Sequence, residues 1–87
     1  MKESEIRAQV RDYLRWKGWL VYYQLQGLGC YPGLSDLVAI KNGRTVHVEL
    51  KTRTGKQGEK QVEFQADLEA AGGEYRVVRG IEDVGDL

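Results

Sequence analysis

Two carboxylates and a lysine stand on two short, strand-like stretches of this chain. Asp36 follows a turn-forming segment, and Glu49, Leu50 and Lys51 close a second run that begins after a short gap. Carboxylates are hard oxygen ligands of the kind that Mg²⁺ and Mn²⁺ prefer. A lysine beside them can orient a water molecule or steady a phosphate oxygen. These residue types together supply what metal-assisted hydrolysis of a phosphodiester requires.

The residues around Glu49 alternate between apolar and polar types. This alternation over residues 46–51 predicts a half-buried strand. Side chains two residues apart share one face of a strand, so Glu49 and Lys51 should project together while Val48 and Leu50 face the core. The carbonyl of Leu50 lies between the two polar side chains and is a candidate backbone ligand for a metal.

A two-residue turn joins this strand to the one that Asp36 opens. Asn42-Gly43 is a strong hairpin signal, and residues 37–40 have the composition of a strand. An antiparallel hairpin would carry Asp36 next to Glu49 and Lys51. An Asp at a strand start and a Glu-x-Lys on an exposed strand are each common structural features. Their combination across a hairpin of this length favours a metal site.

The sequence outside the hairpin predicts two helices and two further strands. Apolar residues at helical spacing, beginning with Ile6 and Val10, give residues 3–17 one apolar face. Residues 19–24 form a strand that is apolar on both faces and should therefore lie centrally in the sheet. A second helix is expected over residues 59–71 and a last strand over residues 75–78.

This order of elements, α-β-β-β-α-β, predicts an α/β fold. The first three strands can form a meander, and a right-handed crossover then adds the fourth strand parallel to the third. The expected architecture is a four-stranded mixed sheet flanked by helices, in a single domain that spans residues 1–87.

The composition excludes several classes of protein. No apolar run approaches the roughly 20 residues of a transmembrane helix, and no signal segment is evident, so we expect a cytoplasmic protein without a membrane partner. The single Cys30 rules out an internal disulfide, and with only one histidine a structural zinc site is not expected.

The charges are unevenly distributed although they sum to zero. Residues 1–60 carry 11 Lys or Arg and 6 Asp or Glu, whereas residues 61–87 carry 2 and 7. The basic part contains the candidate metal site, and a nucleic-acid ligand needs cations near its phosphates rather than a basic protein overall. Five cationic residues are candidate DNA contacts: Arg7, Arg11, Arg53, Lys56 and Lys60.

Four motifs are notable together: Gly33-x-Ser35-Asp36, Glu49-Leu50-Lys51-Thr52, Gly55, and Gln61 placed eleven residues before Gly72. In this combination they resemble the PD-(D/E)XK nuclease superfamily, whose core is restriction-endonuclease-like, and more narrowly the stand-alone VRR-NUC domains of phages and bacteria. The resemblance covers nearly the whole chain. One departure is Ser35, where the family usually has Pro before the Asp.

The resemblance implies a Mg²⁺- or Mn²⁺-dependent DNA endonuclease of a bacterial or phage-infected cell. Small members resemble structure-selective enzymes that form homodimers and cut branched DNA such as four-way (Holliday) junctions. It implies that Asp36 and Glu49 are metal ligands and that Lys51 orients the attacking water. It also implies a site role for Gln61 and for an acidic residue of the first helix, either Glu5, which we prefer, or Glu3.

Two other functions are compatible with the same fold. One is a non-catalytic DNA-binding domain, and the other is an interaction domain, for example an accessory to a helicase. Clustered carboxylates repel phosphate, so binding alone does not account for Asp36 and Glu49. A homodimer is also expected from the residues, because Trp16 lies off the apolar face of the first helix and the chain has many large rings for a small core.

Overall fold

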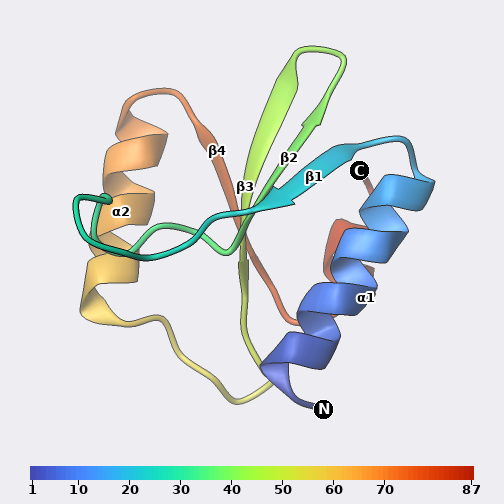
Figure 1. Ribbon diagram of the computed structural model, residues 1–87, viewed down its shortest axis with the longest axis horizontal. Helices are drawn as coiled ribbons and strands as arrows, with labels where there is room; N and C mark the ends of the chain where they lie inside the picture. Colours follow the sequence, from blue (N-terminus) through green and yellow to red (C-terminus); the bar gives the residue numbers. More distant parts are fainter.

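The computed structural model describes residues 1–87 and has the element order expected from the sequence. Two helices lie on opposite faces of one sheet, so the α/β prediction is confirmed (Figure 1). The elements are α1 (Glu3–Trp16), β1 (Leu20–Tyr23), β2 (Leu37–Lys41), β3 (Arg44–Leu50), α2 (Glu59–Ala70), β4 (Glu74–Val78) and the short 3₁₀ helix η1 (Ile81–Val84).

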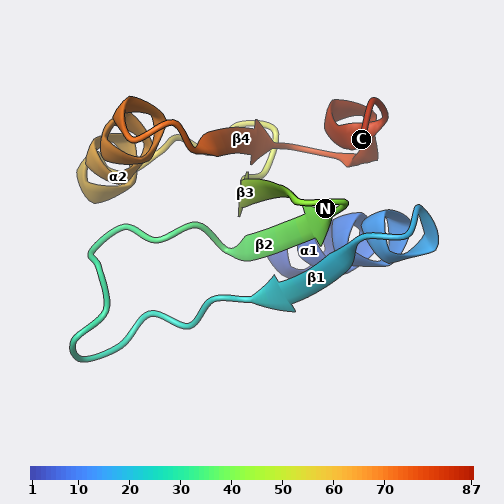
Figure 2. The same ribbon diagram turned by 90° about the horizontal axis from the view of Figure 1, so that it is seen from above.

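The sheet is mixed, and its four strands lie in chain order (Figure 2). β1 pairs with β2 and β2 with β3 in antiparallel fashion, whereas β4 runs parallel to β3. The parallel step needs a crossover, and α2 supplies it while covering one face of the sheet.

The expectation that the first strand lies centrally is wrong, because β1 is an edge strand that pairs only with β2. In a meander each strand is added beside the previous one, and the fourth strand joins at the far side of β3. Leu20 and Tyr22 are consequently 62% and 46% exposed. The apolar character of β1 on both faces marks uncovered surface rather than a central position.

The turn between β2 and β3 sets their register. Asn42 and Gly43 have φ angles of 51° and 81°, the left-handed pair that a two-residue hairpin turn requires. Lys41 pairs with Arg44 and, at the other end, Leu37 pairs with Val48. The predicted hairpin is therefore confirmed.

The main core lies between α1 and the sheet. Ile6, Val10 and Leu14 form the buried stripe of α1, and they pack on the inward-facing side chains of β2 and β3. By contrast, Phe64 is the only buried residue of α2. Neither helix combines the length and the apolar character that crossing a bilayer requires.

Candidate active site

Asp36 is fastened beside the end of β3. Its Oδ2 accepts a hydrogen bond from the backbone N–H of Leu50 at 2.7 Å. The preceding Ser35 is fully buried and donates its hydroxyl to the Leu37 carbonyl at 3.3 Å. Continuing the hairpin register by one residue places Asp36 opposite Glu49. The two carboxylates that the sequence singled out thus lie across one strand pair, and Asp36 Oδ1 is left for another partner.

Glu49 is completely buried, and its two carboxylate oxygens have different surroundings. Oε1 accepts hydrogen bonds from the Tyr75 hydroxyl and from Gln57 Nε2, the latter at 3.1 Å. Oε2 is buried and accepts no hydrogen bond. A buried carboxylate oxygen without a hydrogen bond is costly, so this arrangement leaves a position that a cation would satisfy.

Lys51 directly follows β3, and its side chain lies on the same side as Glu49, as the strand pattern predicted. Its Nζ is 3.7 Å from Glu49 Oε2, which is within ion-pair range but longer than a hydrogen bond. The side chain is only 14% exposed. The ammonium group therefore sits next to the open carboxylate oxygen and keeps its own donors available.

The backbone of Leu50 turns toward Asp36. Its N–H donates to Asp36, and the N–H and C=O of a strand residue point to the same side, so we expect its carbonyl to face that side as well. No three His, Cys, Asp or Glu side chains lie close enough together to hold a metal ion by themselves. Two carboxylates and a carbonyl fit Mg²⁺ or Mn²⁺, which take hard oxygen ligands and retain waters or substrate phosphates in the remaining positions.

Tyr75 and Gln57 are site residues that the sequence did not reveal. Burial, and then the hydrogen bond to Glu49, raise the pKa of Tyr75 well above its ordinary value, so its hydroxyl stays a donor. Gln57 Nε2 also donates to Gln65 Oε1 at 2.9 Å. Because Tyr75 pairs with His47 in the parallel ladder, an accurate β3–β4 register could have placed it on the Glu49 face. No sequence signal singled out Gln57.

Gln61 lies close to the site, but its side chain serves the start of α2. Gln61 Oε1 accepts a hydrogen bond from the Gly58 N–H at 2.8 Å. The loop before Asp36 packs on this first turn, and a Cβ on Gly33 would lie 2.2 Å from the Lys60 carbonyl oxygen. Only glycine allows that approach, at a φ of +81°. The structure thus places Gln61 against this loop with its oxygen engaged in a cap.

No hydrogen bond or ion pair links an acidic residue of α1 to Asp36, Glu49 or Lys51, so a site role for Glu5 or Glu3 stays a prediction. Glu5 is exposed, and its Oε1 accepts a hydrogen bond from the Lys2 N–H at 3.3 Å. Glu3 lies in the same turn and forms no ion pair. Carboxylates in a first helical turn interact favourably with the helix dipole, which explains both residues without a role in the site.

The candidate DNA contacts form two groups. Arg53, Lys56 and Lys60 belong to the segment between β3 and the first turn of α2. Arg53 pairs with Glu82 at 2.7 Å and Lys60 with Glu63 at 3.4 Å, while Lys56 is exposed without an ion pair.

The second group is on α1. The Arg7 guanidinium lies 5.6 Å from the centre of the Tyr23 ring, and Arg11 Nη1 donates to the Tyr23 hydroxyl at 2.5 Å. Tyr23 pairs with Leu37, the residue after Asp36. Because Leu37 pairs in turn with Val48, these two arginines lie with Tyr23 on the α1 side of the sheet, whereas Glu49 is on the α2 side.

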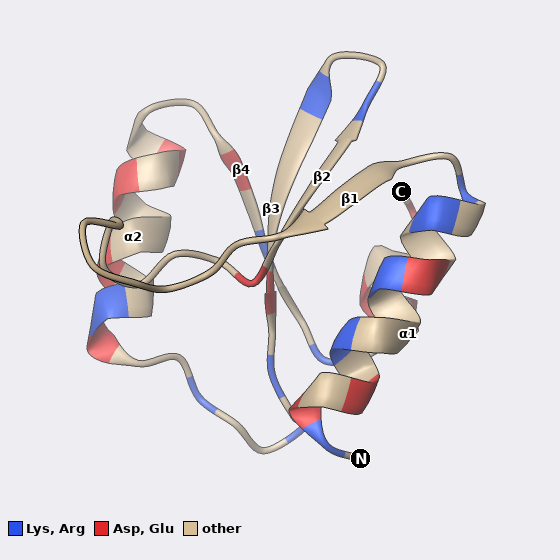
Figure 3. Ribbon diagram, viewed as in Figure 1, with Lys and Arg blue, Asp and Glu red and all other residues tan.

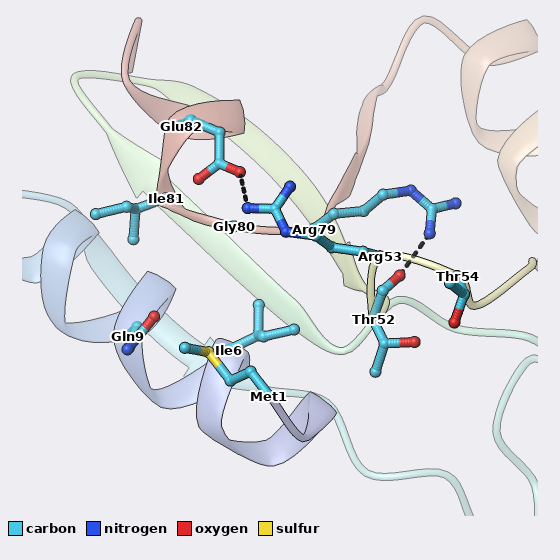
Figure 4. Close-up of a pocket in the computed structure, with 10 residues that line it drawn as sticks. All are labelled: Met1, Ile6, Gln9, Thr52, Arg53, Thr54, Arg79, Gly80, Ile81 and Glu82. Atoms are coloured by element: carbon cyan, nitrogen blue, oxygen red, sulfur yellow. Dashed lines mark hydrogen bonds and ion pairs between the residues drawn. The ribbon is translucent and has the colours of Figure 1, made fainter.

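Arg79 holds the turn that follows Lys51. Its Nη1 donates to the carbonyls of Thr52 and Gly55 at 2.6 and 2.7 Å. It borders a pocket of about 470 Å³ between the start of α1, this turn and the segment leading into η1 (Figure 4). Both arginines of the pocket, Arg53 and Arg79, are engaged with protein acceptors, so the pocket's polar groups brace the loop that carries Lys51.

The arrangement of the whole chain matches a known fold. A solved structure of a VRR-NUC domain superposes with a TM-score of 0.83, covering 98% of this chain and 91% of that chain at 23% sequence identity. No protein-family model and no curated protein sequence matches the chain. The chain therefore has the fold of a VRR-NUC domain over nearly its entire length.

Proposed function

We propose that this protein is a divalent-metal-dependent DNA endonuclease. The observation that carries the proposal is the environment of Glu49: a fully buried carboxylate whose Oε2 has no hydrogen bond, beside Lys51 and across the hairpin from Asp36. A domain that only bound DNA would gain nothing from burying a negative charge in this way. The VRR-NUC fold supports the same function.

The residues have distinct roles in this proposal. Asp36, Glu49 and the Leu50 carbonyl would hold Mg²⁺ or Mn²⁺, which when bound would stabilise charge on the scissile phosphate and lower the pKa of a coordinated water. Lys51 would orient the attacking water and stabilise the negative charge that develops in the transition state. Tyr75 and Gln57 would hold Glu49 so that Oε2, rather than Oε1, faces the reaction.

The proposed substrate is branched DNA, such as a four-way junction, cut by a homodimer. Support for the dimer comes from large apolar side chains along the open edge of the sheet and the adjoining end of α1. Trp16 is 80% exposed and Leu20 is 62% exposed. An exposed apolar edge strand has unpaired backbone N–H and C=O groups that can pair with a strand of another chain. Sedimentation equilibrium should give about twice the 9.9 kDa chain mass. A chain that stays monomeric with and without junction DNA would remove the dimer from the proposal.

The substitution Asp36→Asn tests the function directly. The variant should lose cleavage of labelled duplex, flap and junction DNA at every Mg²⁺ or Mn²⁺ concentration, because an amide is a poor ligand for either metal. Asn keeps an oxygen that can accept the Leu50 N–H, so the fold should survive.

Asp86→Asn is the matched control. Asp86 is exposed, and its carboxylate pairs with Arg76 at 2.5 Å near the C-terminus rather than with Asp36, Glu49 or Lys51. Its loss should leave cleavage unchanged. Full activity of Asp36→Asn, or of the unaltered protein in excess EDTA, would refute the proposed function.

A further inference from the structure

The loop between β1 and β2 combines two unusual properties, exposed apolar side chains and an absence of charge. No Lys, Arg, Asp or Glu occurs between Lys17 and Asp36, and Figure 3 shows this part of the chain without charged colour until the start of β2. Leu28, near the middle of the loop, is fully exposed and Leu25 is 85% exposed. A loop exposed to water normally carries polar side chains, so this composition needs an explanation.

The loop is held in place at both ends and along its length. The Gln24 N–H donates to the Asp36 carbonyl at 2.9 Å, and Gln26 Nε2 donates to the Leu34 carbonyl at 3.0 Å. The turn that carries Leu28 is closed by the Cys30 N–H, which donates to the Gly27 carbonyl at 3.2 Å. These bonds keep the two leucines outside the core.

The returning half of the loop is anchored on α2. The Tyr31 hydroxyl bonds Asp67, and the Tyr31 ring packs edge-on against Phe64 at 5.3 Å between centroids. Gly33 then lies against the backbone of Lys60. These contacts hold the part of the loop that supports the exposed tip at Leu28.

The base of this loop is also the candidate active site, because Asp36 is the residue that ends it. A DNA strand held at Asp36 and Glu49 would therefore lie beside the base of this loop. Apolar side chains cannot contact phosphates, but they can enter a base stack, as the apolar wedges of DNA-bending proteins do. The faces of the bases are the apolar surface that DNA offers to this tip.

We propose that Leu28, supported by Leu25, is a wedge that enters the base stack of DNA bound at the Asp36–Glu49 site. The proposal rests on the proposed function for its choice of DNA as ligand. Opening a fully stacked step costs free energy, whereas a nick, flap or junction already has an interrupted step. The wedge therefore makes the protein select branched DNA over intact duplex.

The test measures DNA binding under conditions in which no cleavage can occur. A junction carrying 2-aminopurine at the branch point is titrated with the protein in EDTA, because the fluorescence of this base rises when it is unstacked. The unaltered protein should raise the fluorescence, and Leu28→Ser should remove the rise and reduce the preference for junction over duplex by about 10-fold, the scale expected when one leucine side chain is no longer buried.

Two controls accompany this variant. Leu28→Met keeps an apolar side chain of similar size and should retain both the rise and the preference. Val62→Ser removes an apolar side chain from α2 that is 51% exposed, and it should behave like the unaltered protein. Circular dichroism checks that all three variants fold.

The outcomes separate this inference from the proposed function. A fluorescence rise and a junction preference that survive in Leu28→Ser overturn the wedge. A fall in sedimentation mass for Leu28→Ser also overturns it, because the tip would then be a self-association surface. Cleavage by the unaltered protein without any rise refutes the wedge alone. A Leu28-dependent rise without metal-dependent cleavage supports the wedge and refutes the nuclease.

Discussion

The two faces of the sheet have different tasks, and strand β3 contributes to both. On the face toward α1, Val46, Val48 and Leu50 are fully buried among apolar side chains. On the face toward α2, the alternate positions carry His47, Glu49 and Lys51. One strand of seven residues thus supplies the centre of the core and the centre of the candidate site. The chemistry is possible there because the opposite side of the same backbone is fixed by packing.

The two helices differ in the same way. α1 buries three apolar residues, whereas α2 buries only Phe64. Around Phe64 lie the partly polar rings of Tyr31, His47 and Tyr75, with centroids 5.3 to 6.2 Å away. The α2 face therefore has less apolar packing and more hydrogen-bonding groups than the α1 face. Most of the stability must consequently come from the α1 face. Substitutions on the two faces should separate activity from stability.

Glu49→Gln should produce the largest separation. We expect cleavage to fall by about 1,000-fold or more, since the substitution removes a proposed ligand of the metal ion that would stabilise the transition state. The melting temperature should change much less than the rate, because the lost ion pair with Lys51 is offset by the removal of a buried charge whose Oε2 has no hydrogen bond. Single-turnover rates and thermal unfolding measure the two effects. A large fall in melting temperature would mean that the α2 face also contributes substantially to the stability of the fold.

Leu14→Ala should produce the opposite result on the α1 face. Leu14 is completely buried, so its truncation should lower the free energy of unfolding by about 2–5 kcal/mol. The cleavage rate of the folded fraction should not change. Urea unfolding gives the stability, and Val62→Ala, an exposed truncation on α2, should stay within about 0.5 kcal/mol of the unaltered protein. A slow but fully folded Leu14→Ala would show that the faces are coupled.

Tyr75→Phe should have a smaller effect that is confined to the site. Removing the hydroxyl takes one donor from Glu49 Oε1 and frees the carboxylate to rotate. Residues that orient a metal ligand typically contribute about 10–100-fold in metal affinity or activity. We therefore expect a higher Mn²⁺ concentration for half-maximal cleavage, with much of the rate recovered at saturating metal. A loss of stability at an unchanged metal requirement would make Tyr75 a packing residue only.

His47 should have the smallest effect, visible as a pH dependence of stability. Burial lowers the pKa of His47. The folded protein thus binds a proton at His47 less readily than the unfolded chain, so stability is complete above the unfolded-state pKa of about 6.5 and is lost as the pH falls through it. His47→Gln should reduce the loss of stability between pH 7 and pH 5. An identical loss in this variant would assign the effect to other groups.

The sequence predicted most of the fold because local signals agreed with one another. The Asn42-Gly43 turn and the alternation that ends at Lys51 were sufficient to place Asp36 beside Glu49. For β1 two signals disagreed. Apolar residues on both faces are expected for a central strand, whereas a meander with the fourth strand beside the third leaves β1 at the edge, which is where it lies.

The site was predictable where it is local and unpredictable where it depends on tertiary packing. Tyr75 is 26 residues from Glu49 in sequence and reaches it only through the parallel pairing of β4. Gln57 reaches Glu49 from the loop between β3 and α2, and hydrogen bonds from Arg79 hold this loop in place. The sequence assigned Glu5 and Gln61 to the site. In the structure, each of these side chains accepts a hydrogen bond from the backbone N–H of the residue that precedes its helix.

The two-residue turn at Asn42-Gly43 has a further consequence, for the order of events during folding. Closing a short hairpin takes about 1–10 μs, and this hairpin alone brings Asp36 and Glu49 together. The parallel pairing that delivers Tyr75 requires a crossover through α2, and such non-local contacts form later because more chain must be ordered first. We therefore expect the carboxylate pair to assemble early and its hydrogen-bond donors to arrive late. The two negative charges would then face each other without Tyr75 and Gln57 during folding, and a divalent cation present at that stage should accelerate the final step.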